Sequence, residues 1–315
     1  MKDDELSAKK VPPHDLDAEQ SVLGCIRPDY GSIKTIIKDR IKTIENAHDH
    51  RGITGVPTGF DRLDSLTCGL QNANLIILAS RPGMGKTAFA LSIARNAAIN
   101  MGIPVAFFSL EVSKEQLVQR MLSSEANVEA EKMWTGFVSE IEWPKIIKAA
   151  CHLSEAPIYI DDSTGITMQD IKTKITRMHA NKGVGIVFID CLQLIKCTGM
   201  CKTQKAICRS LKALATELNI PVVVLSKLNS KPENRSWLRR RPELADLLGS
   251  GALEADADVI LFIYRSELYN TSEDNPEKGT AEIIIAKQRN GPNDYVSLGF
   301  NKEYGCFENL NRPAG

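Results

Sequence analysis

Short apolar runs alternate with amphipathic stretches along the chain from residue 52 onward. The first of these runs are apolar throughout, which favours buried strands, and the stretches between them are rich in Ala, Leu, Lys and Glu, which favour helices. The predicted strands are 75–80, 105–111, 157–161, 185–190, 221–226, 258–264, 281–288 and 295–300. This alternation predicts an α/β fold with a mostly parallel, twisted sheet and helices on both of its faces.

The last two predicted strands have a different connection. Residues 289–294, Arg-Asn-Gly-Pro-Asn-Asp, lie between them and are rich in residues that favour turns. We therefore expect a C-terminal β-hairpin beside the parallel strands.

The first 51 residues follow another pattern. Residues 1–31 are polar and contain Pro, apart from a helix-like stretch at 15–26. Ser32 is placed to cap a helix over 33–47, whose isoleucines recur on one face. That face must be buried, either on the same subunit or on a neighbouring one. We predict three parts: a residual N-terminal segment (1–31), a linker helix (32–51) and a main domain (52–315).

Composition and charge limit the class of protein. The chain has 39 basic and 39 acidic residues, so its net charge does not indicate a nucleic-acid-binding protein. Its N-terminus is charged and no apolar run reaches membrane-spanning length, which predicts a cytoplasmic protein without a membrane segment. Four of the eight cysteines fall between 191 and 208 without a C-x-x-C pair, which favours reduced thiols over a metal site.

Residues 80–87, Ser-Arg-Pro-Gly-Met-Gly-Lys-Thr, have the pattern of a phosphate-binding loop between a strand and a helix. Ser80 stands where the general pattern has Gly. In this setting backbone N–H groups and the helix N-terminus bind phosphates, Lys86 reaches the β and γ oxygens, and the Thr87 hydroxyl binds Mg²⁺. The residues expected to contact the nucleotide are Arg81, Pro82, Gly83, Met84, Gly85, Lys86, Thr87 and Ala88.

Two acidic residues end predicted strands. Asp190 ends the run Ile186-Val187-Phe188-Ile189, as in a Walker B element, and is expected to hold Mg²⁺ with Thr87. Glu111 ends the run after the phosphate-loop helix. Because an ATPase needs a carboxylate that orients and deprotonates water, we assign Glu111 as the general base.

A pair of cations lies next to the predicted hairpin turn. Lys287 and Arg289 are two apart on a strand, so their side chains point to the same side. They are placed to complete the active site of a neighbouring subunit by neutralising charge on the γ-phosphoryl group. By spacing alone, a solvated charge pair is the favoured interpretation.

Six segments carry a specific resemblance over residues 52–310. They are Val-Pro-Thr-Gly-Phe-Asp-Arg-Leu-Asp at 56–64, the loop at 80–87, Phe-Ser-Leu-Glu at 108–111, Ile-Asp-Cys-Leu-Gln-Leu-Ile at 189–195, Ser-Gly-Ala-Leu-Glu-Ala-Asp-Ala-Asp at 250–258 and Ala-Lys-Gln-Arg-Asn-Gly-Pro at 286–292. In this order they resemble bacterial and phage replicative DNA helicases of the DnaB type.

The resemblance implies a RecA-like P-loop ATPase and helicase domain that uses ATP and Mg²⁺. It also implies a homo-oligomer, a hexameric ring around single-stranded DNA, with translocation from 5′ to 3′. Lys86, Thr87, Glu111 and Asp190 would act in one subunit, and Lys287 and Arg289 would reach in from the next.

The N-terminus departs from the family. Residues 11–24 resemble the opening of the family's N-terminal helical domain, but most of that domain is missing from the sequence. Since this domain engages primase and steadies the ring in the family, contact with primase or a loader is in question.

Two positions in the main domain also depart from the family pattern. Lys227 stands where the family has a Gln that senses the γ-phosphate, and Leu248-Gly249 stand where it usually has Arg-Glu in a DNA-gripping loop. These departures predict weakened coupling between nucleotide state and DNA. Basic residues around Trp237 and after Asp190 would still suit a DNA backbone.

We therefore expect an ATP-dependent replicative DNA helicase. The alternative is a nucleotide-gated adaptor or inhibitor that joins or blocks helicase rings without unwinding. A second alternative is a RecA-fold recombinase or clock-type ATPase, although no appended DNA-binding motif favours it.

Overall fold

The computed structural model describes residues 32–34, 37–38, 41, 52–198, 201, 203–235, 240–272 and 274–310. The chain divides into two compact units, Met1–Asp49 and His50–Gly315. Within the first unit, the described residues 33, 34, 37, 38 and 41 are helical. The rest of the predicted linker helix and the predicted N-terminal segment lie outside the described residues.

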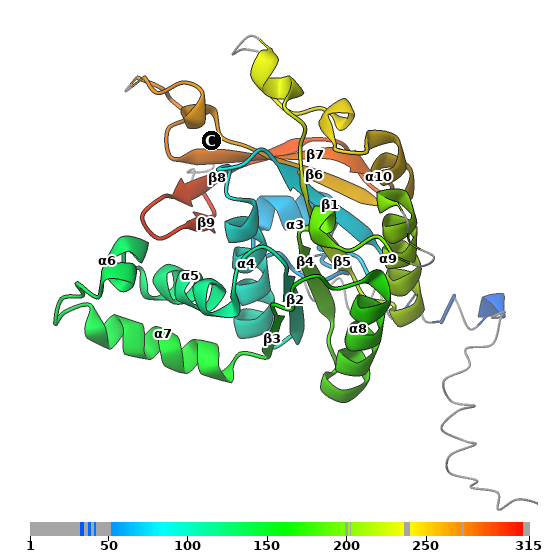
Figure 1. Ribbon diagram of the computed structural model, residues 1–315, viewed down its shortest axis with the longest axis horizontal. Helices are drawn as coiled ribbons and strands as arrows, with labels where there is room; N and C mark the ends of the chain where they lie inside the picture. The colour runs from blue at the N-terminus through cyan, green and yellow to red at the C-terminus, as the bar shows by residue number, and fades with distance from the viewer. Residues whose placement is uncertain are drawn as a thin grey trace, which may run out of the picture. The chain divides into compact units, whose positions relative to one another are not determined.

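Within the described residues, the second unit is built on a nine-stranded sheet (Figure 1). Its spatial order is β3-β2-β4-β5-β1-β6-β7-β8-β9, parallel from β3 to β6 and antiparallel from β6 to β9. The strands are β1 (Leu75–Ser80), β2 (Val105–Ser109), β3 (Ile158–Asp161), β4 (Ile186–Asp190), β5 (Val222–Lys227), β6 (Val259–Tyr264), β7 (Thr280–Gln288), β8 (Tyr295–Asn301) and β9 (Cys306–Glu308).

Helices cover both faces of the sheet (Figure 1). Those on one face are α3 (Asp61–Thr67), α4 (Lys86–Arg95) with its π-helical extension η1 (Asn96–Asn100), α5 (Lys114–Ala126), α6 (Ala130–Thr135) and α7 (Trp143–Glu155). Those on the other are α8 (Met168–Lys182), α9 (Gln204–Leu218) and α10 (Ser250–Asp256). Short 3-10 turns are η2 (Leu192–Leu194), η3 (Lys231–Asn234), η5 (Leu244–Asp246) and η6 (Ser266–Leu268).

Alternate side chains of each central strand enter two separate apolar cores. In β1, Ile76 and Leu78 pack with Phe89 of α4, whereas Leu75 and Ile77 belong to the core with α8 and α9. All of β1 is buried. Because both faces are covered, a strand in this position must be apolar throughout, which is the pattern that the sequence has.

The predicted fold class is confirmed, and each predicted strand is present with small changes at its ends. The hairpin is also present, formed by β7 and β8. The sequence analysis missed β9, a three-residue strand at the edge of the sheet. It also placed Glu111 at a strand tip, whereas β2 ends at Ser109 and Glu111 lies in the following turn.

Two further expectations concern cysteines and membranes. The seven cysteines in the described part of the chain are all unbridged. Among the described residues, no helix is both long and apolar enough to cross a bilayer.

Candidate nucleotide-binding site

The phosphate loop links the central strand β1 to α4 and depends on glycine for its shape. Gly83 has a φ of 82° and Gly85 a φ of 93°, in the left-handed region that disfavours other residues. A Cβ on Gly85 would also lie 3.1 Å from the ring of Phe307. The loop is held from outside, because Arg81 Nη1 donates to the carbonyl of Leu228 at 3.0 Å.

Thr87 and Asp190 meet directly although 103 residues separate them. The Thr87 hydroxyl donates to Asp190 Oδ2 at 2.6 Å, and Asp190 Oδ1 is buried without a hydrogen-bond partner. Burial raises the pKa of Asp190. A hydroxyl oxygen beside a carboxylate with an unused oxygen fits Mg²⁺, which prefers oxygen ligands.

Glu111 is paired with Lys227. Lys227 Nζ donates to Glu111 Oε1 at 2.9 Å, and the thiol of Cys191 lies 3.6 Å from Glu111 Oε2. The hydrogen bond from Lys227 lowers the pKa of Glu111, and the charge of Lys86 acts in the same direction. Ligand atoms of Glu111, Asp190 and Cys191 all lie within 4.8 Å of one another.

These groups border a cavity of about 390 Å³ above the phosphate loop. Its lining includes Lys86, Thr87, Glu111, Arg120 and Lys227. Within the described residues, neither Lys86 nor Arg120 makes a side-chain hydrogen bond or an ion pair. The sequence analysis missed Arg120. The available signal was its position on α5, the helix that follows the Glu111 turn.

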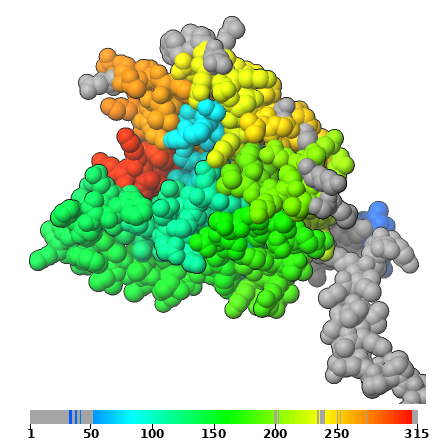
Figure 2. Space-filling view, in the orientation of Figure 1, coloured from blue at the N-terminus to red at the C-terminus, as the bar shows by residue number. Residues whose placement is uncertain are grey.

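Arg265 is a second residue that the sequence analysis missed. It is buried, its Nη1 donates to the carbonyl of Gly83 at 3.2 Å, and its guanidinium lies 3.8 Å from the ring centre of Phe300. Glu267 pairs with it. Figure 2 shows the cyan surface near the phosphate loop between the yellow and orange segments, which agrees with the contacts of Arg81 and Arg265.

Lys287 and Arg289 do not lie in this cavity. β7 runs antiparallel to β6, so Gln288 pairs with Val259 at the amino end of β6, at the sheet edge opposite the phosphate loop. Lys287 Nζ donates to the carbonyls of Glu254 and Ala257, and Arg289 Nη2 to that of Ala255. Both side chains therefore point to the same side, as their spacing predicted, and on that side they meet the end of α10.

Several arginines of the predicted DNA-binding cluster are engaged within the protein. Arg235 forms two hydrogen bonds with buried Asp246, at 2.8 and 3.0 Å. Arg240 stacks over Tyr269, and Arg241 pairs with Glu282. The side chains nearest Trp237 lie outside the described residues. Arg235, Arg240 and Arg241 therefore have partners within the domain, which the sequence prediction of a DNA-binding cluster did not include.

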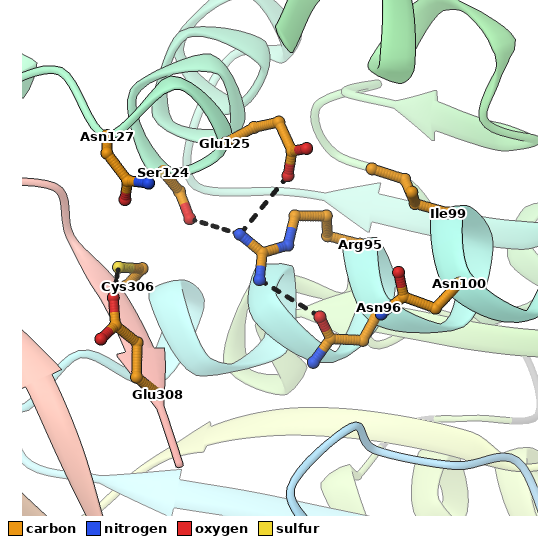
Figure 3. Close-up of a pocket in the computed structure, with 9 residues that line it drawn as sticks. All are labelled: Arg95, Asn96, Ile99, Asn100, Ser124, Glu125, Asn127, Cys306 and Glu308. Carbon is orange, nitrogen blue, oxygen red and sulfur yellow. Dashed lines mark hydrogen bonds and ion pairs between the residues drawn. The ribbon is translucent and has the colours of Figure 1, made fainter. Parts of the chain in front are cut away.

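A second polar cavity, of about 300 Å³, lies at the other end of α4 (Figure 3). Arg95 points into it and donates to Ser124 at 3.1 Å and to Asn96 at 3.2 Å. It also lies 3.6 Å from Glu125 Oε2. Its guanidinium is thus satisfied by neighbouring side chains.

A parallel sheet with a phosphate loop after its central strand, and acidic residues after two adjacent strands, defines a RecA-like P-loop ATPase domain. The model of the DnaB-like helicase C-terminal domain family matches residues 55–309. The chain belongs to this family.

Known proteins agree with that assignment. The chain is 46% identical over 289 residues to the replicative DNA helicase DnaB of Geobacillus stearothermophilus. It is 45% identical over 289 residues to the replicative DNA helicase DnaC of Bacillus subtilis. In both comparisons the match covers 90% of this chain and 63% of the relative, so the chain spans less than two thirds of their length.

Solved structures give the same result. A solved ATPase domain matches with a TM-score of 0.83 and 38% identity, over 90% of this chain and 100% of that domain. A DnaB-like replicative helicase, studied with its interactions with primase, matches with a TM-score of 0.78 and 37% identity, over 94% of this chain and 71% of its own.

Proposed function

We propose that this chain is the ATP-hydrolysing motor of a replicative DNA helicase that moves 5′ to 3′ along single-stranded DNA. The observation that carries the proposal is one cavity bordered by Lys86, Thr87 and Glu111. Asp190 accepts a hydrogen bond from Thr87 and has a carboxylate oxygen within 4.8 Å of one of Glu111, so the four residues that follow or end β1, β2 and β4 meet at one end of the sheet. Membership of the DnaB-like family supports the DNA substrate.

Each residue has a role in the proposed hydrolysis. Lys86 and Arg120 neutralise phosphate oxygens, and the loop N–H groups hold the phosphates. Glu111 accepts a proton from the water whose oxygen attacks the γ-phosphorus. The bond to the bridging oxygen breaks, and ADP and phosphate are released. Thr87 and Asp190 would hold Mg²⁺, which supplies positive charge to the β and γ oxygens.

Lys287 and Arg289 act in the proposal on a neighbouring subunit. They lie at the amino ends of the parallel strands, whereas the phosphate loop lies at the carboxyl ends, so they cannot reach phosphates bound in their own subunit. Burial and the charge of Arg289 lower the pKa of Lys287. Moving Lys287 from the carbonyls of Glu254 and Ala257 to a neighbour's phosphates would exchange neutral partners for a charged one. Arg289 would exchange its ion pair with Asp258 for one with a phosphate.

Exposed apolar surface supports a homo-oligomer, which we propose to be a hexamer. The described isoleucines Ile33, Ile37 and Ile41 are each at least half exposed. Trp134, Phe137, Ile141, Trp143 and Ile147 are exposed on and between α6 and α7. Deleting residues 1–47 should shift the protein towards monomers in sedimentation at micromolar concentration. An unchanged oligomer would contradict a bridging role for this helix.

The adaptor alternative is supported by specific residues. Leu248 is exposed where the family usually has a basic residue, and Lys227 is engaged with Glu111. Both would weaken the link between ATP and DNA. No primase contact is proposed, because the segment that resembles the family's N-terminal domain lies outside the described residues.

The rate of ATP hydrolysis with and without single-stranded DNA tests the proposal. We expect hydrolysis that depends on Lys86, weak stimulation by DNA and slow strand separation. Brisk 5′ to 3′ unwinding would remove the adaptor alternative. Absence of hydrolysis by the intact oligomer would contradict the motor itself.

A restoring variant tests the DNA grip. Lys227→Gln with Leu248→Arg should increase stimulation by DNA and steepen the salt dependence of binding by about 0.7 log units per new phosphate contact. Adding Gly249→Glu completes the family pattern, but Gly249 has a φ of 82°. A side chain there costs about 1–2 kcal/mol, so the double variant is the cleaner test. No gain in either assay would show that this loop does not contact DNA.

A further inference from the structure

The pairing of Lys227 with Glu111 is a feature that hydrolysis alone does not require. Lys227 ends β5 and pairs in register with Ser80, the last residue of β1. Its backbone is fixed, since its N–H donates to Gln193 Oε1 at 3.3 Å while Gln193 Nε2 donates to the Ser226 hydroxyl at 2.8 Å. The side chain is therefore the movable part of this residue.

That side chain extends into the cavity where the phosphates would lie. Both Lys227 and Glu111 line the cavity, and their side chains are 40% and 43% exposed. An ion pair exposed to this extent is weak and easily exchanged. A triphosphate, with its larger negative charge, competes for the same ammonium group.

The ion pair also engages Glu111, the proposed general base. Glu111 Oε1 accepts from Lys227, and Oε2 lies next to the Cys191 thiol. A carboxylate engaged in this way is a poor acceptor for a proton from water, because the ammonium group stabilises its charged form.

We propose that Lys227 is a nucleotide-operated latch on Glu111. In the empty site and with ADP, Lys227 stays on Glu111. When ATP binds, its γ-phosphate draws Lys227 away, and Glu111 is released to accept the proton from the attacking water. Lys227 is thus a positioning residue that couples the γ-phosphate to the base. This inference rests on the proposed ATPase function.

Equilibrium binding without turnover tests the latch. The probes are the Mg²⁺ complexes of a β,γ-imido ATP analogue and of ADP, which differ in the γ-phosphate. Lys227→Met should lower the affinity for the analogue by about tenfold, the scale of one charged hydrogen bond, and leave the affinity for ADP unchanged. The matched control is Lys172→Met, which removes an exposed ion pair with Glu217 between α8 and α9 and should change neither affinity.

Glu111→Gln gives the second arm. Without its carboxylate partner, Lys227 is free to meet the γ-phosphate, so the analogue should bind a few-fold more tightly while ADP is unchanged. This gain should vanish in the double variant Glu111→Gln, Lys227→Met, because no latch is left to release.

Three results would overturn the latch: Lys227→Met without effect on the analogue, equal weakening of analogue and ADP, or no tightening by Glu111→Gln. The proposed function fails separately. It is contradicted if the unmodified protein binds neither nucleotide, or if Lys86→Ala hydrolyses ATP at the original rate.

Discussion

The two ends of α4 border two cavities of similar size, and the cations that line them differ in whether another side chain of the described residues pairs with them. At the N-terminal end, Lys86 and Arg120 border about 390 Å³ without an ion pair in the described residues. At the C-terminal end, Arg95 borders about 300 Å³ and is held by Ser124, Asn96 and Glu125. Cavity volume alone would not separate them.

The difference follows from the direction of the helix as well as from its side chains. The N-terminal end presents free N–H groups and partial positive charge, which adds to the charge of Lys86. At the other end α4 continues into η1, and the positive charge of Arg95 is balanced there by Glu125. The first cavity is therefore suited to an anion, whereas the second is a network that stabilises the fold.

The largest expected effect separates the two cations. Lys86→Ala should abolish ATP hydrolysis while the fold stays intact, because the lysine is a point charge on the phosphates and not a core residue. Arg95→Ala should retain hydrolysis. Steady-state ATPase rates and circular dichroism measure both. Hydrolysis by Lys86→Ala at the original rate would reject the phosphate-loop assignment.

A smaller effect is expected for the general base, Glu111, in the same cavity. Glu111→Gln should slow turnover at least about a hundredfold while Mg²⁺–ATP still binds, because the amide cannot accept the proton. Single-turnover hydrolysis and nucleotide binding separate the two steps. If the variant only binds nucleotide more weakly, our assignment is wrong: Glu111 would then hold Mg²⁺ and Asp190 would be the general base.

The smallest effect is expected at the other end of α4. Arg95→Met should lower the free energy of unfolding by about 1–3 kcal/mol, because it leaves partly buried acceptors without their donor. Urea denaturation of the whole chain, followed by circular dichroism, measures this change in the free energy of unfolding. Leu91→Met on the same helix is a control for side-chain replacement in α4. A changed KM for ATP with unchanged stability would reverse our view of this cavity.

The sequence predicted those parts of the site that depend on local pattern. The apolar runs ending near Ser80 and Asp190 predicted the strands, and strand order then brought Asp190 to Thr87. Neighbouring parallel strands end at the same sheet edge, so acids in these positions had to converge.

Contacts between distant side chains were not predictable in the same way. The ion pair of Lys227 with Glu111 spans 116 residues, and Arg120 enters the cavity only because α5 packs with that side towards the loop. Basic residues after β5 looked like a DNA-binding run, yet Arg241 is paired with Glu282 of β7. Charge patterns along a chain do not show which charges are already neutralised in the fold.

Lys86 and Lys287 lie at opposite ends of the strands of one sheet, and under the proposed function this placement would determine how many copies can be active together. If each phosphate loop is completed by the hairpin cations of the next copy, contacts run head to tail. An open row of copies then always has one loop without cations at one end and one unused pair of cations at the other. Closing the row removes both ends at once, so the activity per subunit would rise in a step at ring closure.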